Sequence, residues 1–567
     1  MTRHDRPRCL QPSDATNGTA ALPAASCCLT WRRPSIDVSE HSSVIERLQR
    51  GWGIFVLPAC LAAGLYLPSV WHQFVYDDLE IVVRHPLMHT VRTFPELVVS
   101  PYWYATGKLY RPLTSLTLGI DWVVGGGSPV VSHVVNVLLH AVVTVLVGLL
   151  AARWLPRLGA VTAATIFAIH PVHVEAVSTA VGRAELLCAT MLLSLMLFAS
   201  RAAPATARER AAAAILAALA LASKETGVVA PALAFVAAWA SPTQRAAAWR
   251  WAAAAFAGVV PMLLVRLIVL GTIGGDVPHP ALVVGSWVVR ERLALATAVQ
   301  TLGALLLPHS APIDVAPTLA QASAPSLVLT AIGLSVAAAT CVVVVRHFKR
   351  PTVATLAVAI AVFTIAPTAN LLFASGVVLA GRTLYSPSIG VALLGGAFVS
   401  LVIASQPRAI RRPAIGLLAC WAVAAVLVSA RDVGIWRDSD RVSAAMLTRE
   451  PDNFRAHAYA AELARDRRDM PTALGHYRAA IQLFPSERYL LYSAAVAALD
   501  VGDTTSAASW LDDAVKVAPK HWQARTRLAK VEAWRGDTTR ARQILDDGLQ
   551  LDPGQQTWRA MREQLGR

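Results

Sequence analysis

Charged residues are scarce in this chain. Only 15% of its 567 residues are Asp, Glu, Lys or Arg, whereas 55% are hydrophobic, and the mean hydropathy is +0.49. Soluble globular domains have about 25% charged residues. The apolar residues are also gathered into long runs, which excludes an ordinary soluble protein and predicts a polytopic membrane protein.

Cysteine is scarce as well. The seven Cys form no CxxC or His-paired pattern, and none follows Cys420, so neither a disulfide framework nor a zinc site is implied. The net charge of +15 comes from basic residues in short runs between apolar segments, which indicates membrane topology and no nucleic-acid partner. No cleavable signal peptide is evident either, and we expect the first span to be an uncleaved anchor.

Eleven apolar stretches approach or reach the roughly 20 residues that cross a bilayer. They predict an all-α bundle of about eleven spans, at 51–70, 131–152, 158–177, 184–200, 211–223, 225–240, 250–272, 326–346, 352–374, 384–404 and 413–430. Arg and Lys collect at alternate ends, near 47–50, 153–157, 201–210, 245–250, 346–350 and 408–412. This side should be the cytoplasm, which predicts a protein of the inner (cytoplasmic) membrane with its amino terminus inside and its carboxyl terminus outside.

The predicted membrane domain, 46–440, follows a polar segment, 1–45, that we expect to be a disordered cytoplasmic tail. Its external loops are expected at 72–130 and 273–325. Residues 292–308 are apolar enough for a twelfth span, but counting them would place the basic run at 346–351 outside. We therefore expect 292–308 to lie in, or dip into, the membrane interface.

A repeat occupies the carboxyl-terminal segment, 451–567. Pro451, Pro485, Pro519 and Pro553 are spaced 34 residues apart, which is the tetratricopeptide period. Small residues recur at fixed offsets between them, as at Ala473, Ala507 and Ala541. The pattern predicts three repeats and a capping helix that form an extracytoplasmic solenoid. Such a surface would bind a protein or peptide, or else only hold subunits together.

The stretch FVYDDLE places Asp77 and Asp78 just past the first apolar run. An acidic pair at a membrane surface can hold a cation or remove a proton from an acceptor, although Asp77 could instead cap a helix beside a solvated Asp78. Other polar residues gather at the same predicted leaflet. These are Tyr110, Arg111, His133, Asn136, His140, His170, His173, Glu175, Arg183, Glu185, Lys224, Glu225, Arg382 and Tyr385.

Each of these residues also has a purely structural interpretation. His133 and His140 could be satisfied between helices, and Lys224 and Arg382 could snorkel to the interface. The sequence HPVHVE lacks the HExxH arrangement, and Pro171 breaks helical spacing, which disfavours a metal site. Together, however, ionisable groups at one leaflet suit transfer chemistry on a lipid-linked phosphate, in which a carboxylate deprotonates a hydroxyl and cations stabilise the departing phosphate.

Six motifs occur in order before the repeats: FVYDD, YRPLTSLTL, SHVVNVLLHA, HPVHVEAVSTAVGRAELL, SKETG and GRTLYSPSIG. In this order the chain resembles a bacterial member of the transmembrane and tetratricopeptide repeat-containing O-mannosyltransferases, from about residue 70 to its end. The resemblance implies a GT-C-type glycosyltransferase with an external active site. Its donor would be a polyprenyl-phosphate-linked sugar, mannose or another hexose, and its acceptor a Ser or Thr hydroxyl of an extracytoplasmic protein.

The resemblance matches the acidic pair of that family to Asp77 and Asp78, one of which would be the general base, with a slight preference for Asp77. We expect Lys224, Arg382 and Arg183 to hold the donor phosphate. The substrate cleft is expected to include Tyr110, Arg111, His133, His170, His173, Glu175 and Glu225. No cofactor is implied, and a divalent metal is left open without being indicated.

Two other function classes remain. A non-catalytic membrane scaffold would use the repeats for protein interaction and would tolerate loss of the acidic pair. A transporter or flippase for lipid-linked sugars would need alternating access, yet the sequence shows no inverted repeat and no matching pair of broken helices.

Overall fold

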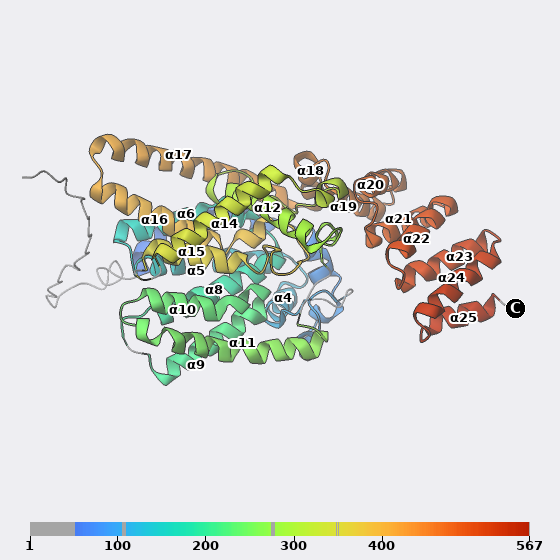
Figure 1. Ribbon diagram of the computed structural model, residues 1–567, viewed down its shortest axis with the longest axis horizontal. Coiled ribbons are helices and arrows are strands. Elements are labelled where there is room, and N and C mark those ends of the chain that lie inside the picture. The colour runs from blue at the N-terminus through green and yellow to red at the C-terminus, as the bar shows by residue number, and fades with distance from the viewer. Residues whose placement is uncertain are drawn as a thin grey trace, which may run out of the picture.

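The computed structural model describes residues 52–104, 109–203, 205–273, 278–347, 349 and 351–565. The predicted tail, 1–45, lies outside them. Over the described residues the fold is helical and has no extended strand, which confirms the all-α prediction. Figure 1 shows the apolar helices gathered in one body and the repeat helices extending from it to the carboxyl terminus.

Seven of the described helices are long and apolar enough to cross a membrane. They are Gly53–Trp71, Val130–Ala151, Ala180–Ala199, Arg245–Leu270, Leu327–His347, Ser388–Ser405 and Arg408–Arg437. A bent pair, Arg157–Ile169 and Pro171–Ser178, makes an eighth if it counts as one span. The other three predicted spans coincide with shorter helices: α9 (Ala207–Ser223), Glu225–Ala240, which includes α10 (Ala230–Ala240), and α15 (Val353–Ile365). The count of eleven stays a prediction.

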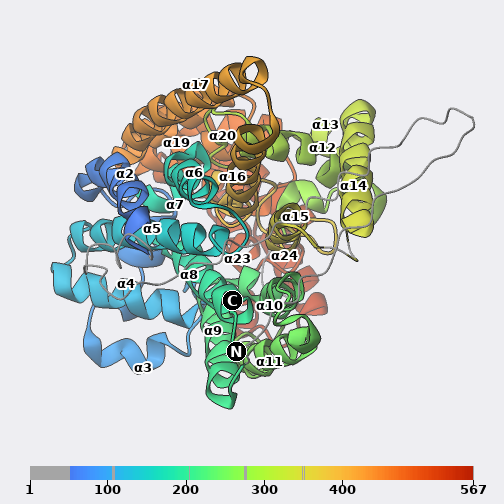
Figure 2. The ribbon, with the colours of Figure 1, turned by 90° about the vertical axis from the view of Figure 1, so that its left-hand side faces the viewer.

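The long helices pack closely because small residues line their contacts. Helix α9 lies along α11 (Ala248–Leu270), and a side chain at Gly258 would overlap the carbonyl oxygen of Ala214. Helix α6 (Arg157–Ile169) lies in the same way along α16 (Ser388–Ser405). Figure 2 shows α9, α10 and α11 grouped at one side of the body and α17 (Arg408–Val433) at the other.

The chain bends by 49° after α6, where Pro171 follows His170. Proline lacks the N–H that a continuing helix needs, and its ring clashes with the preceding turn. The chain therefore restarts as η6 (Pro171–His173) and α7 (Val174–Ser178), and then enters η7 (Ala180–Gly182) and α8 (Arg183–Ala199). The break places these short helices beside the acidic turn, where the backbone N–H groups of Ala180 and Val181 donate to Asp78.

The segment predicted to lie in the interface, 292–308, coincides up to residue 306 with one helix, α12 (Trp287–Leu306), which packs along α14 (Leu327–His347). Gly333 allows the close approach, since a side chain there would overlap the backbone of Leu295. The position of α12 relative to a bilayer stays a prediction. The remaining helices of this body are α2 (Val56–Tyr66), α4 (Pro112–Gly125), α5 (Val130–Ala151) and the short α3 (Phe94–Leu97) and α13 (Leu319–Ser323).

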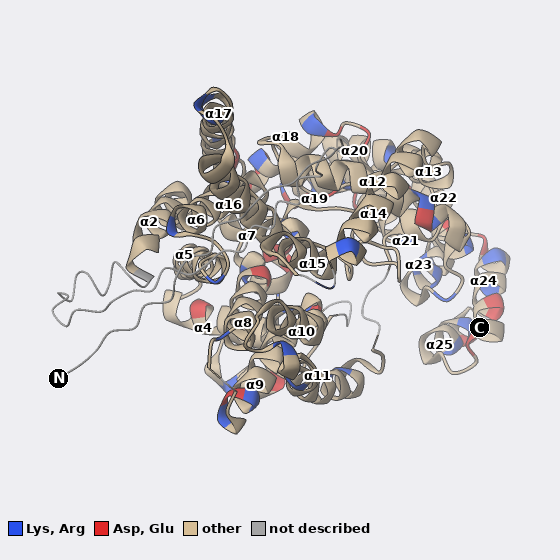
Figure 3. Cartoon of the chain, turned by 60° about the vertical axis from the view of Figure 1, so that its left-hand side comes forward, with Lys and Arg blue, Asp and Glu red and all other residues tan. Residues whose placement is uncertain are grey.

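Three antiparallel helix pairs and a last helix follow α18 (Ser439–Arg449). The pairs are α19–α20 (Phe454–Asp466 and Met470–Leu483), α21–α22 (Arg488–Asp500 and Thr504–Val517) and α23–α24 (Trp522–Trp534 and Thr538–Leu551), and α25 (Gln556–Gln564) ends the series. Ala473, Ala507 and Ala541 are fully buried, as small residues at a repeated helix contact should be. The predicted repeat architecture is therefore confirmed. Charged residues are frequent in this part of the molecule, whereas the long apolar helices carry them mainly near their ends (Figure 3).

Candidate active site

Asp77 and Arg382 form an ion pair at the centre of the polar region. Asp77 Oδ2 lies 2.6 Å from Arg382 Nη1, and the same nitrogen lies 3.3 Å from Glu175 Oε1. The Arg382 backbone N–H also donates to Glu175 Oε2 at 2.8 Å. The Asp77 and Arg382 side chains remain 17% and 21% exposed, whereas Glu175 is only 4% exposed. The structure thus brings together three predicted residues from distant segments and leaves two of them open to a ligand.

Local backbone features place this trio. Asp77 follows Tyr76, whose φ of 54° lies in the left-handed region that non-glycine residues rarely occupy. Arg382 is in η11 (Gly381–Leu384), and Gly381 packs where a side chain would meet Ala311 Cβ at 2.9 Å. A tight turn and a glycine contact therefore bring the two charged groups together.

Asp78 has a very different environment from its neighbour. It is fully buried, and its carboxylate accepts backbone N–H bonds from Val181 at 2.9 Å, Ala180 at 3.2 Å and Val75 at 3.3 Å. Burial raises the pKa of Asp78 to about 7, although the three N–H donors favour its ionised form. Asp78 therefore joins the acidic turn to the start of η7.

A second cluster of charged residues lies at the carboxyl-terminal end of α9. Lys224 pairs with Glu185, and both side chains are buried. Burial lowers the pKa of Lys224, and the positive charges of Arg111 and Arg382 lower it further. Lys224 thus lies within electrostatic reach of the Asp77 pair, but a carboxylate already engages its ammonium group.

Glu225, the next residue, is held by two arginines. Its carboxylate lies 2.7 Å from Arg111 Nη2 and 3.1 Å from Arg266 Nη1. Arg111 also covers the ring of Tyr102 at 4.9 Å. Arg266 lies within the apolar helix α11, and its pairing with Glu225 was not predicted.

The side chain of Arg183 is buried and fully engaged by neighbouring residues. Its side chain is 1% exposed and lies 2.6 Å from Asp121 Oδ2, 2.5 Å from Asn136 Oδ1 and 3.0 Å from the Ser132 carbonyl oxygen. The predicted donor-phosphate role of Arg183 is therefore not favoured by this geometry. Arg183 instead joins α8 to α4 and α5.

The predicted histidines form separate polar contacts. His170 Nε2 contacts the Leu305 carbonyl oxygen at 3.0 Å, and His173 Nε2 contacts Ser388 Oγ at 2.7 Å. His140 contacts the Tyr385 hydroxyl at 2.9 Å, and His133 is buried against the ring of His72. Within the described ranges, no three His, Cys, Asp or Glu side chains lie close enough together to hold a metal ion. Tyr110, predicted for the cleft, donates to the Val98 carbonyl oxygen at 2.8 Å.

The sequence analysis missed Asp314, which is buried beside the Asp77 turn. Its Oδ2 accepts hydrogen bonds from the Tyr76 hydroxyl at 2.9 Å and from Arg455 Nη1 at 2.8 Å. An isolated carboxylate in the mostly apolar stretch 305–325 is the signal that could have pointed to it.

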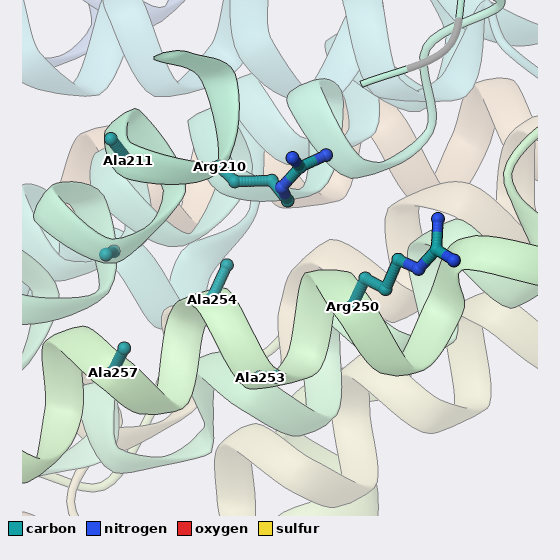
Figure 4. A pocket seen from close by; sticks show the side chains of 7 residues that line it. Arg210, Ala211, Arg250, Ala253, Ala254 and Ala257 are labelled. Atoms are coloured by element: carbon teal, nitrogen blue, oxygen red, sulfur yellow. The ribbon is translucent and has the colours of Figure 1, made fainter. Parts of the chain in front are cut away.

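A hollow between α9 and α11 lies away from this polar region. It has a volume of about 580 Å³, and Arg210 of α9 and Arg250 of α11 border it together with alanines of both helices (Figure 4). Arg210 precedes Lys224 along α9 by roughly 20 Å at 1.5 Å per residue. This hollow is therefore not part of the Asp77 cluster.

Comparisons with known proteins identify relatives of part of this chain. The chain is 36% identical over 146 residues to the protein O-mannosyl-transferase Tmtc1 of Drosophila melanogaster, covering 24% of this chain and 17% of that protein. It is 37% identical over 142 residues to TMTC4 of Homo sapiens, covering 21% and 19%. The chain is similar in sequence to the TMTC protein O-mannosyl-transferases. This confirms the predicted resemblance to the family, whereas the bacterial origin stays a prediction. The matched region spans less than a fifth of either relative.

The repeats have an independent match, because the sequence model of the tetratricopeptide repeat matches residues 498–565. Among solved structures, the archaeal oligosaccharyltransferase AglB from Archaeoglobus fulgidus, in complex with an inhibitory peptide and a dolichol-phosphate, aligns with a TM-score of 0.40 and 15% identity. That alignment covers 78% of this chain and 60% of AglB.

Proposed function

We propose that this protein is a membrane glycosyltransferase that moves a hexose from a polyprenyl-phosphate donor to a Ser or Thr hydroxyl of an extracytoplasmic protein. The observation that carries the proposal is the partly exposed Asp77–Arg382 pair, backed by Glu175. It combines a proton acceptor and a phosphate-binding cation at one point. The similarity to protein O-mannosyl-transferases supports the same reaction class and favours mannose as the sugar.

Asp77 is the general base in this proposal. Its carboxylate takes the proton of the acceptor hydroxyl as that oxygen attacks the anomeric carbon in line, and the bond from this carbon to the phosphate oxygen breaks. The leaving group is the polyprenyl phosphate, and the configuration at the anomeric carbon inverts. A positioned base contributes typically about 10²–10⁴-fold to such a step.

Arg382 stabilises the phosphate that leaves. A guanidinium has five N–H donors, and the contacts with Asp77 and Glu175 use only some of them. Arg382 can therefore bind phosphate oxygens while it still orients the base. Lys224 and Arg111 add positive potential next to it, and each is balanced by a carboxylate that prevents a large uncompensated charge before the donor arrives.

Asp78 has a supporting role. All three of its described hydrogen bonds come from backbone N–H groups, and the residue is inaccessible to an acceptor. The geometry therefore favours Asp77 over Asp78 as the base. The repeats would bind the acceptor protein, for which the surface around Tyr492 and Arg527 offers an aromatic ring and a cation joined by a 2.7 Å hydrogen bond.

The test is transfer of radiolabelled mannose from polyprenyl-phosphate mannose to a Ser/Thr peptide, measured with the purified full-length protein. Asp77→Asn should lower the rate about 10²–10⁴-fold because it removes the base. Glu80→Gln is the matched control, since Glu80 lies in the same turn region but pairs with Arg84 at the surface. Its rate should stay within about twofold of the wild type.

A wild-type protein that transfers no hexose, with glucose tested alongside mannose, would contradict the proposal and favour the scaffold. Full activity in Asp77→Asn would remove Asp77 from the role of base. For the repeats, Arg527→Ala should slow transfer to a folded protein acceptor and leave transfer to a short peptide unchanged. If Arg527→Ala and the wild type transferred to the folded protein acceptor at equal rates, the recognition role of this surface would be contradicted.

A further inference from the structure

Asp314 connects the first repeat to the acidic turn. It is 4% exposed and lies in the connection between α12 and α13. Its carboxylate accepts from both the Tyr76 hydroxyl and Arg455, and its carbonyl oxygen accepts from Asn453 Nδ2 at 2.5 Å. Three segments that are far apart in the sequence therefore meet at one residue.

The neighbours of Asp314 hold the other half of the catalytic pair. Gly381 donates its N–H to the Pro312 carbonyl oxygen at 2.7 Å, and Val315 donates to the Leu379 carbonyl oxygen at 2.9 Å. Residues 312–315 thus run beside 379–381, immediately before Arg382. The same short segment holds Tyr76, which precedes Asp77, and the backbone that leads into Arg382.

Helix α19 of the first repeat also contacts Tyr76 directly. The Tyr76 N–H donates to the Tyr459 hydroxyl at 3.3 Å, and the two rings meet edge to face with centroids 5.1 Å apart. Tyr76 has the left-handed backbone conformation described above. Such conformations persist only where surrounding contacts hold them, and here α19 and Asp314 supply those contacts.

A second bridge joins the repeats to the same turn region but has a different character. Arg84 Nη2 lies 3.3 Å from Asp466 Oδ2, and both side chains are about half exposed. Arg455 is less exposed, and it spans from Asp314 to the Gly376 carbonyl oxygen at 3.2 Å. The Arg84 bridge therefore lies at the surface, whereas the Arg455 bridge reaches the segments beside Asp77 and Arg382.

We infer that the first repeat is a positioning element of the active site. Through Arg455 and Asp314 it holds residues 76–77 and 379–382 in the geometry in which Asp77 meets Arg382. Arg455 and Asp314 are positioning residues and do not touch substrate. The catalytic consequence rests on the proposed function, whereas the structural coupling is independent of it.

Hydrogen–deuterium exchange of the full-length protein in detergent measures the coupling directly. Arg455→Ala should speed exchange at least about threefold in peptides that cover 74–84 and 377–384, because the amides of Tyr76 and Gly381 lose support. Asp466→Ala, the matched control, removes the surface bridge from the repeat side and should leave both peptides unchanged. Unchanged exchange at both peptides in Arg455→Ala would overturn the inference.

Steady-state transfer to a short Ser/Thr peptide measures the consequence. Arg455→Ala should lower kcat about tenfold or more with a change in KM below about threefold, because a displaced base slows chemistry more than peptide binding. Arg455→Lys keeps a cation for Asp314 and should recover most of kcat. Asp466→Ala should match the wild type.

The outcomes separate the two claims. Faster exchange with an unchanged kcat in Arg455→Ala would overturn the positioning role. A loss confined to folded protein acceptors would mean that the repeats serve recognition alone, which also overturns it. If Arg455→Ala does not fold, Tyr459→Phe, which removes the hydroxyl that accepts from the Tyr76 N–H, decides by the same two measurements. Faster exchange over 74–84 together with a lower kcat supports the inference, and wild-type values of both contradict it. A wild-type protein without transferase activity would contradict the proposed function, while exchange still decides the coupling.

Discussion

Arg382 and Arg183 are both arginines paired with carboxylates, and both lie in motifs that predict donor binding. Arg382 keeps 21% of its side chain exposed and contacts Asp77 and Glu175, which come from two other segments. Arg183 is 1% exposed, and Asp121, Asn136 and the Ser132 carbonyl oxygen occupy its guanidinium. The two residues have the same chemistry but differ in access.

The difference shows that an ionisable group in a membrane protein can be conspicuous in the sequence for either of two reasons. A buried charge without a partner is very costly, so a structural arginine must come with a full set of acceptors. An arginine that binds a ligand must leave donors and surface free. Only Arg382 meets the second condition.

The largest expected effect on stability comes from Arg183→Ala. The substitution leaves Asp121 buried without its partner, so the free energy of unfolding should fall by about 3–5 kcal/mol. Arg382→Ala should cost less, about 1–3 kcal/mol, because Asp77 can be hydrated when its partner is lost and the buried Glu175 keeps its hydrogen bond from the backbone N–H of residue 382. Thermal denaturation in detergent would measure both, with exposed Arg208→Ala as the control. Equal losses of unfolding free energy in the two variants would contradict the assignment of Arg183 to a structural role and Arg382 to ligand binding.

A smaller effect separates the two adjacent aspartates. Asp78→Asn turns an amide NH₂ toward backbone N–H donors and should lower the free energy of unfolding by about 1–3 kcal/mol. Asp77→Asn should cost about 1 kcal/mol or less, since its pair with Arg382 is partly hydrated. The same denaturation experiment checks this order. A reversed order would contradict the supporting role of Asp78.

The last effect is a dependence of stability on pH at Asp78. The folded-state pKa of Asp78 is raised to about 7 from an ordinary value of 3.8, so the folded protein retains a proton that the unfolded chain has released. Stability from this group is complete below about pH 4 and is lost as pH rises to about 7. The stability difference between wild type and Asp78→Asn should therefore shrink from pH 5 to 7, by at most about 1.4 kcal/mol per pH unit. A difference that grows with pH over this window would show that the N–H donors outweigh burial.

The repeat domain was largely predictable because its signal is local and periodic. Gly502 and Gly536 share a 34-residue offset, and both have positive φ angles, 78° and 90°, in the turn between paired helices. Arg468, at the same offset, has a φ of 63° without the freedom of glycine. The shared backbone conformation explains why the offset recurs, and the helix pairs follow from it.

The candidate site was predictable only in part. Local motifs located Asp77, Glu175 and Arg382, but no local pattern indicates that Arg382 meets a carboxylate 305 positions away. No local pattern indicated the partners Asp121, Arg266 and Asp314 either, because each is a single polar residue in an apolar context. Pairing between spans depends on which helices lie side by side, and hydropathy determines only that each span exists.

The bonds from Ala180 and Val181 to Asp78 also constrain the order of assembly. They join residues 102 and 103 positions apart, on opposite sides of the bent segment 157–178. Synthesis proceeds from the amino terminus, so the Asp78 carboxylate lacks these two donors while the next spans are inserted. The acidic turn can reach its final shape only after Val181 emerges, so a nascent chain that ends before Thr179 carries the aspartates without a formed site.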